Sequence, residues 1–167
     1  MKHIKREEVS EVRDYKLEKI LGVKGAITVA EFIKQSIKTK KIKVACIGEP
    51  GTGKTLVLKV LLNEIGYFEE SEACDNIKSK DDFKYAASNK CKYFTSACMD
   101  ITELVDRLEE TSNYNISENY LVLDCVKDNN GERYVKAVYE ITTINNDMVV
   151  KELVVIHKER YRIIDEV

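Results

Sequence analysis

The sequence lacks any long apolar run, and this absence argues against a membrane-spanning protein. Its longest run, around Leu56, is interrupted by Lys59 and is far shorter than the roughly 20 residues that cross a bilayer. The N-terminus has no apolar segment behind its charged residues, so we do not interpret it as a secretory signal. With 167 residues, of which 44% are hydrophobic and 34% charged, the chain is typical of one globular domain.

The chain also lacks the paired cysteine motifs of zinc-binding or redox proteins. Its cysteines are odd in number, and no two of them form a C-x-x-C pair. Their apolar surroundings indicate reduced thiols in the core of a cytoplasmic protein. A zinc site is the alternative for three of them, but their spacing does not match a zinc knuckle. Those three are Cys74, Cys91 and Cys98, and the other two are Cys46 and Cys125.

A strong excess of one charge is absent as well. The formal net charge is −2, so we expect no direct binding of DNA or RNA. The first 60 residues nevertheless carry 14 Lys and Arg against 7 Asp and Glu. We interpret this local excess as solvated helix faces and a basic approach to a phosphate site.

The chain has only one proline, Pro50, and it lies within the most specific motif. The segment Gly48–Thr55 fits G-x-x-x-x-G-K-[ST], the pattern of a phosphate-binding P-loop. Gly51 and Gly53 lack the Cβ that would block a polyphosphate, and they allow positive φ. The backbone N–H groups of such a loop turn inward around an anion, and the following helix adds its positive end.

The neighbouring segments supply the strand and the helix that this motif requires. Residues 42–47 form an apolar run suited to a buried strand, and residues 56–65 predict a mostly buried helix that Gly66 ends. An ordinary glycine-rich turn is the competing interpretation, and this context disfavours it. We therefore expect Lys54 to reach the β- and γ-phosphates of ATP and Thr55 to ligate Mg²⁺, both as catalytic residues. The residues expected to bind the nucleotide are Glu49, Pro50, Gly51, Thr52, Gly53, Lys54, Thr55 and Leu56.

Hydrolysis needs a further carboxylate, and the sequence offers two places for it. The apolar run that ends at Asp124 has the form of a strand whose acid holds Mg²⁺ and activates water. A hairpin signal follows directly at residues 128–131, however, and indicates that Asp124 begins an antiparallel meander. The other place is an acidic stretch before residue 76, for which a solvated loop is the more ordinary interpretation. Its carboxylates are Glu69, Glu70, Glu72 and Asp75.

The remaining segments predict helices first and strands last. We expect an N-terminal helical extension over residues 1–24, with an amphipathic helix at 7–21, and a P-loop nucleotide-binding domain over 25–167. Caps at Ser79 and Asp100 predict two more helices. The expected strands are 91–97, 120–126, 132–144, 148–156 and 160–164, of which the last four form an antiparallel meander. The fold is therefore expected to be α/β.

Three stretches resemble the C-terminal motor domain of the type II and type IV secretion ATPases, which drive pilus assembly and conjugation. Residues 25–33 resemble the helix before the P-loop strand of that family. Residues 94–109 resemble its T-S-H-A box and the following helix, and residues 128–141 resemble its late D-G-x-R hairpin. The resemblance implies a RecA-like P-loop core that assembles as a homo-oligomer, in particular a hexameric ring, on membrane-associated secretion or conjugation machinery.

The same comparison shows where the chain departs from the family pattern. The histidine of the family's box falls at Ala97, and the stretch between Leu62 and Tyr93 is too short for the family's acidic box and second nucleotide-binding strand. We expect an ATPase that hydrolyses the γ-phosphate. A non-hydrolysing nucleotide switch or degenerate paralogue is the alternative, and a small-molecule kinase ranks last.

Arginines are the remaining candidates for a role at the nucleotide. Arg107, Arg133 and Arg160 could each act in trans as an arginine finger within a ring. An exposed surface arginine is the commoner case.

Overall fold

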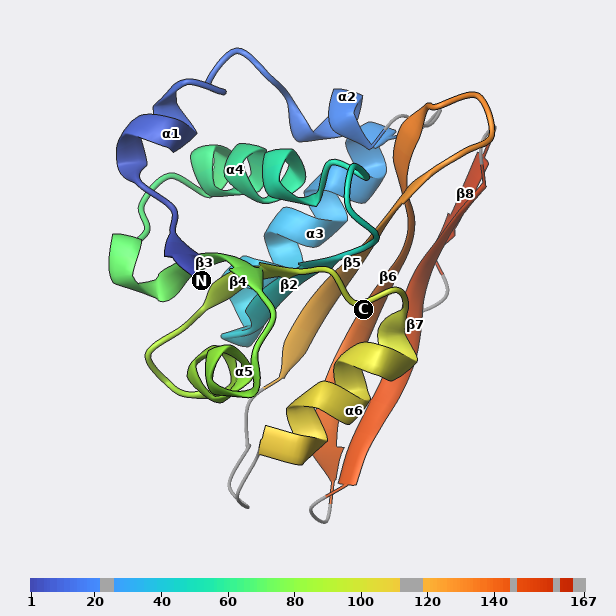
Figure 1. Ribbon diagram of the computed structural model, residues 1–167. Helices are drawn as coiled ribbons and strands as arrows, with labels where there is room; N and C mark the ends of the chain where they lie inside the picture. The colour runs from blue at the N-terminus through green and yellow to red at the C-terminus, as the bar shows by residue number, and fades with distance from the viewer. Residues whose placement is uncertain (22–25, 112–118, 145–146, 158–159, 164–167) are drawn as a thin grey trace.

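A single mixed β-sheet organises the protein, as the computed structural model shows (Figure 1). The structure describes residues 1–21, 26–111, 119–144, 147–157 and 160–163. Eight strands pair in the order β1-β3-β4-β2-β5-β6-β7-β8. The four central strands run parallel to one another and carry the P-loop at the end of β2. They are β3 (Ala73–Ile77), β4 (Tyr93–Ser96), β2 (Lys43–Ile47) and β5 (Tyr120–Lys127).

Antiparallel strands extend this parallel core on both sides. β6 (Arg133–Ile144), β7 (Asp147–His157) and β8 (Arg160–Ile163) follow β5 as consecutive antiparallel neighbours. β1 (Lys2–His3) pairs with the opposite edge of the core, against β3. The predicted C-terminal meander is therefore confirmed, and the hairpin β5–β6 begins where its turn signal indicated.

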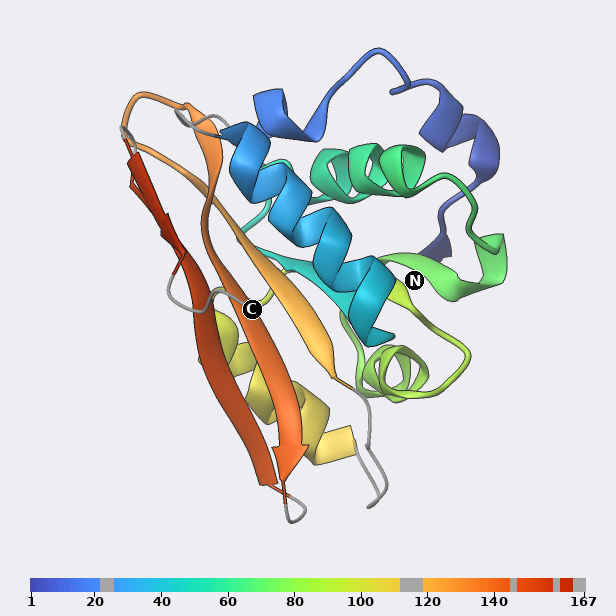
Figure 2. The same ribbon diagram turned by 180° about the vertical axis from the view of Figure 1, so that it is seen from behind.

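Helices cover the two faces of the sheet in separate pairs, as Figures 1 and 2 show. α3 (Ala26–Lys40) and α4 (Lys54–Ile65) lie on one face. α5 (Lys80–Ala87) and α6 (Ile101–Thr111) lie on the other face. The caps predicted at Ser79 and Asp100 are present, because Ser79 forms a capping box with α5 and Asp100 accepts the backbone N–H of Glu103.

The core strand β2 is buried on both faces, as is typical of a parallel strand between two helical layers. Val44 and Cys46 belong to the apolar cluster beneath α3 and α4. Ala45 and Ile47 belong to the second cluster, beneath α5 and α6. Successive side chains of a strand point to opposite faces, so one five-residue segment contributes to both halves of the core.

The N-terminal extension differs from the single helix predicted over residues 7–21. It contains β1 and two short helices, α1 (Arg6–Ser10) and α2 (Leu17–Ile20). The backbone N–H of Leu17 donates to Glu64 of α4 at 2.9 Å and fixes where α2 begins. Leu17 is fully buried in the cluster beneath α3 and α4, so tertiary packing interrupts the helix that local periodicity favoured.

The acidic stretch after α4 is the second difference, because it leads into a strand. Glu70–Glu72 form a short 3-10 helix, and β3 follows at once. The interpretation as a solvated stretch holds for Glu69, Glu70 and Glu72, which precede the strand, but it is wrong for Asp75, which lies in β3. β3 is short and lacks regular apolar alternation, and it is stabilised by pairing with β1 and β4, which sequence periodicity does not indicate. Among the described residues, no helix is long and apolar enough to cross a membrane.

Candidate functional site

The P-loop lies at the carboxyl edge of the parallel strands, where the chain leaves neighbouring strands toward opposite faces. β2 continues into α4 on one face, whereas its neighbour β4 continues into α6 on the other. Such a switch point opens a crevice at the ends of the strands, and ligands of α/β proteins bind there. The sheet thus places Gly48–Thr55 at the expected position of a ligand site.

The conformation of the loop depends on its glycines at two positions. Gly48 has φ +149°, and a Cβ there would lie 2.3 Å from the carbonyl oxygen of Cys125 in the adjacent strand. Gly53 has φ +85° and is the N-cap of α4, without a side chain to satisfy the first N–H groups of that helix. Those N–H groups therefore point into the loop with no capping acceptor, as an anion site requires.

Lys54 lies back across this loop. Its Nζ donates to the carbonyl oxygen of Glu49 at 3.3 Å, and the hydroxyl of Thr52 donates to the same oxygen at 2.8 Å. Pro50 and Gly51 are exposed at the tip of the loop. The ammonium group of Lys54 is consequently held above the loop by one long hydrogen bond, which a phosphate can replace.

A hydroxyl–carboxylate cluster lies beside the loop, on the α4 face of the sheet. Thr55 donates to Asp75 Oδ1 at 2.9 Å, and Thr95 donates to the same oxygen. These side chains come from α4, β3 and β4, and Thr95 is fully buried. The structure thereby selects Asp75 from the five carboxylates that the sequence left open, and it adds Thr95, which sequence reasoning missed.

A β-bulge places Asp75 at the site. The register of β3 against β4 shifts between Cys74 and Ile77, so that β3 holds one residue more than β4. Asn76 adopts φ +64°, and its N–H donates to Thr95 Oγ1 at 2.8 Å. A bulge bends its strand and redirects a side chain, and bulges recur next to active sites. The sequence gives no strong signal for this one, since asparagine marks many turns.

The other acidic candidates lie elsewhere. Asp124 is 1% exposed and forms an ion pair with Lys136 at 3.6 Å, while neither carboxylate oxygen accepts a hydrogen bond among the described residues. Burial raises the pKa of Asp124 above its usual value. Glu69 and Glu70 precede β3 and pair with residues of the N-terminal segment, and Glu72 lies in the same short helix. None of these four carboxylates contacts Thr55 in the described structure.

The cysteines are core residues. All five are buried and free. The pKa of Cys46, beneath the P-loop, is raised well above its usual value by a hydrogen bond with Cys125 and by burial, so this thiol is no nucleophile at neutral pH. Within the described ranges, no group of three or more His, Cys, Asp or Glu side chains could hold a metal ion. The burial of the five thiols agrees with the expectation that they are core residues.

Compared with protein-family models and with curated proteins, the chain gives no match. Function must therefore be argued from the geometry of the site itself.

The three candidate arginines have different surroundings. Arg133, at the start of β6, lies against the P-loop of its own chain, where its Cδ is 3.3 Å from the position of a Cβ at Gly53. Arg107 of α6 lines a separate pocket with Ser96 and Cys98, on the opposite face of the sheet. Arg160 belongs to β8, and its side chain is outside the described part of the structure.

Proposed function

We propose that the protein binds Mg·ATP at the P-loop. The observation that carries this proposal is the 2.9 Å hydrogen bond between the Thr55 hydroxyl and Asp75. A hydroxyl at the start of the P-loop helix and a carboxylate on a core strand are the protein ligands that Mg²⁺ takes in P-loop nucleotide sites. Mg²⁺ retains several waters, so two oxygen donors suffice from the protein.

The donor groups of the site fit this ligand on chemical grounds. Thr55 and Asp75 supply hard oxygen ligands, which suit Mg²⁺ better than the buried thiols nearby. The uncapped N–H groups of α4 and the ammonium of Lys54 supply the donors for the phosphates. Bound Mg²⁺ neutralises charge on the phosphate oxygens, and Lys54 complements it from the other side of the loop.

A RecA-like core and a relation to the secretion ATPases belong to the same proposal. A parallel core that carries the P-loop, followed by an antiparallel meander, supports it, as do the three stretches that resemble that family. Under this proposal the protein hydrolyses the γ-phosphate of ATP and assembles as a hexameric ring on secretion or conjugation machinery. Oligomeric state with and without Mg·ATP, measured by light scattering, tests the ring.

A non-hydrolysing nucleotide switch is the second candidate, and one residue favours it. A base for the attacking water commonly follows directly on the metal-binding aspartate, and here that residue is Asn76. A neutral amide cannot accept the proton of water at this point. If this candidate holds, wild-type protein binds Mg·ATP without turnover, and Asn76→Glu raises phosphate release at least tenfold.

Equilibrium binding and phosphate release, each with wild type and Lys54→Ala, test the proposal. We expect micromolar binding of Mg·ATP by wild type and a loss of at least tenfold in the variant. Lys54-dependent phosphate release identifies an ATPase, and binding without release identifies a switch. Equal binding by the two proteins, or none by wild type, would refute nucleotide binding at this loop.

A further inference from the structure

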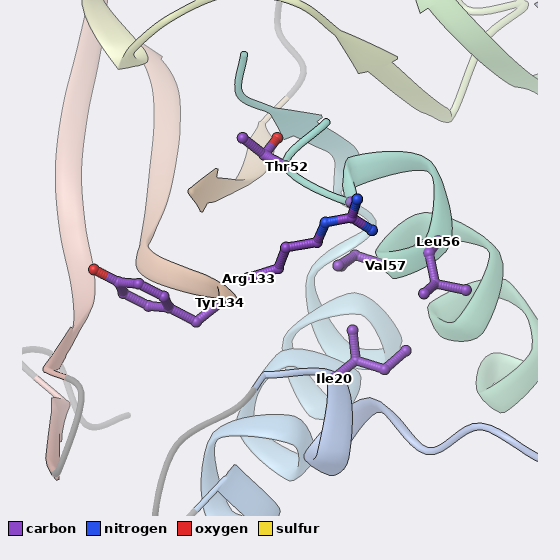
Figure 3. Close-up of a pocket in the computed structure, with 7 residues that line it drawn as sticks. Ile20, Thr52, Leu56, Val57, Arg133 and Tyr134 are labelled. Atoms are coloured by element: carbon purple, nitrogen blue, oxygen red, sulfur yellow. The ribbon is translucent and has the colours of Figure 1, made fainter. Parts of the chain in front are cut away.

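A pocket adjoins the P-loop on the side away from Asp75 (Figure 3). Asp75 lies on β3, whereas the pocket lies toward β6, and β2 separates these strands in the sheet. Its walls come from three segments far apart in sequence. Ile20 ends α2, Leu56 and Val57 belong to the first turn of α4, and Arg133 begins β6.

The lining of the pocket is mainly apolar, with one cation at its edge. The side chains of Ile20, Leu56 and Val57 supply aliphatic surface, and Arg133 extends from the hairpin toward the P-loop. The enclosed space measures about 50 Å³, far less than the roughly 300–1,000 Å³ of a complete small-molecule site. It therefore suits the edge of one ring, and the remainder of the ligand lies outside it.

Arg133 has no ion-pair partner in the described part of the chain. Its side chain lies against Gly53, the N-cap of α4, where the helix dipole presents its positive end. Although Arg133 is exposed to solvent, a cation at the positive end of a helix is mildly unfavourable, and an anion between the two relieves this repulsion. The arrangement of Arg133 and α4 therefore calls for an anionic group at the border between the loop and the pocket.

We propose that the base and ribose of the nucleotide pack against the mouth of this pocket, while Arg133 pairs with the phosphate nearest the ribose. This inference rests on the proposed function, since the P-loop must hold the remaining phosphates. A planar base lies between the aliphatic side chains of Ile20 and Leu56. Arg133 thus acts within its own chain, on nucleotide bound to the same subunit.

This placement predicts how much of the affinity comes from the phosphates and how much from the base and ribose. Inorganic tripolyphosphate presents the same phosphates as ATP but has no base or ribose. It should therefore bind through the P-loop and Arg133 while leaving the pocket empty, and ATP should bind at least tenfold more tightly. A bulky side chain in the pocket should weaken only the binding of ATP, whereas loss of the Arg133 cation should weaken the binding of both ligands.

Isothermal titration calorimetry with ATP and with inorganic tripolyphosphate, both in Mg²⁺, tests the inference. The pocket variant is Ile20→Trp, and Ile65→Trp, at the far end of α4, is the matched control. We expect Ile20→Trp to weaken the binding of ATP at least tenfold and to change the binding of tripolyphosphate less than twofold. Arg133→Gln should weaken both ligands by similar factors. The control, Ile65→Trp, should alter the binding of neither ligand.

The outcomes separate failure of this inference from failure of the proposed function. If Lys54→Ala leaves the binding of both ligands unchanged, nucleotide does not bind at the P-loop and both proposals fail. If binding depends on Lys54 but Ile20→Trp changes ATP and tripolyphosphate equally, the base lies elsewhere and only this inference fails. Should Ile20→Trp not fold, as judged by its melting temperature, Leu56→Ala replaces it. That variant removes one wall of the pocket and should weaken ATP selectively.

Discussion

Replacing Asp75 by asparagine tests the part of the site that the tertiary structure assembled. The substitution keeps the shape of the side chain and an oxygen that can accept from Thr55 and Thr95. The fold should therefore persist, and what changes is the charge. We expect Asp75→Asn to bind Mg·ATP more weakly than wild type while binding metal-free ATP equally well.

The magnitude follows from the loss of one charged contact. Interactions with charged groups contribute about 1.5–3 kcal/mol each, and 1.4 kcal/mol corresponds to tenfold in affinity. Because Asp75 is only half-buried, a value near the lower end is appropriate. Binding of Mg·ATP should weaken by roughly 10- to 30-fold.

The assay is isothermal titration calorimetry with ATP in Mg²⁺ and again in EDTA. The matched control is Asp124→Asn, since Asp124 also lies at the carboxyl ends of the strands, where it is level with Ile47. The control should bind Mg·ATP within twofold of wild type, because Asp124 pairs with Lys136 and does not contact Thr55. If Asp124→Asn loses Mg²⁺-dependent affinity and Asp75→Asn does not, the assignment of the metal ligand is wrong.

The remaining predictions concern stability. Gly48→Ala should lower the free energy of unfolding by about 3 kcal/mol in urea denaturation, because its Cβ would collide with the backbone of Cys125. Gly51→Ala, where a Cβ meets no atom within 4 Å, should cost only the roughly 1–2 kcal/mol of a positive φ, and equal losses would contradict this account. Burial raises the pKa of Asp124, so the folded state binds this proton more tightly than the unfolded state. The contribution of Asp124 to stability should therefore fall as pH rises from its unfolded pKa through its folded pKa. The melting temperature of Asp124→Asn, minus that of wild type, should be larger at pH 7 than at pH 4. If the difference in melting temperature is the same at both pH values, burial does not raise the pKa of Asp124.

Local patterns identified most of the elements correctly. The P-loop, its strand and its helix were recognisable because glycine, lysine and threonine occur there at a fixed spacing within a few residues. The caps at Ser79 and Asp100 and the hairpin after β5 were equally local. Failures occurred where distant contacts outweighed local preference, as in the divided N-terminal helix and in β3.

The sequence alone therefore determined that the chain carries a P-loop motif between a buried strand and a helix. It could not decide which of five carboxylates approaches that loop, since the answer depends on strand order, on register and on a single bulge. Pairing of β3 with β4 brings Asp75 within 2.9 Å of Thr55, across 20 residues of chain. In the same way, the meander brings Arg133 against Gly53, across 80 residues. Such contacts arise from hydrogen bonding and packing between remote segments, which no local pattern encodes.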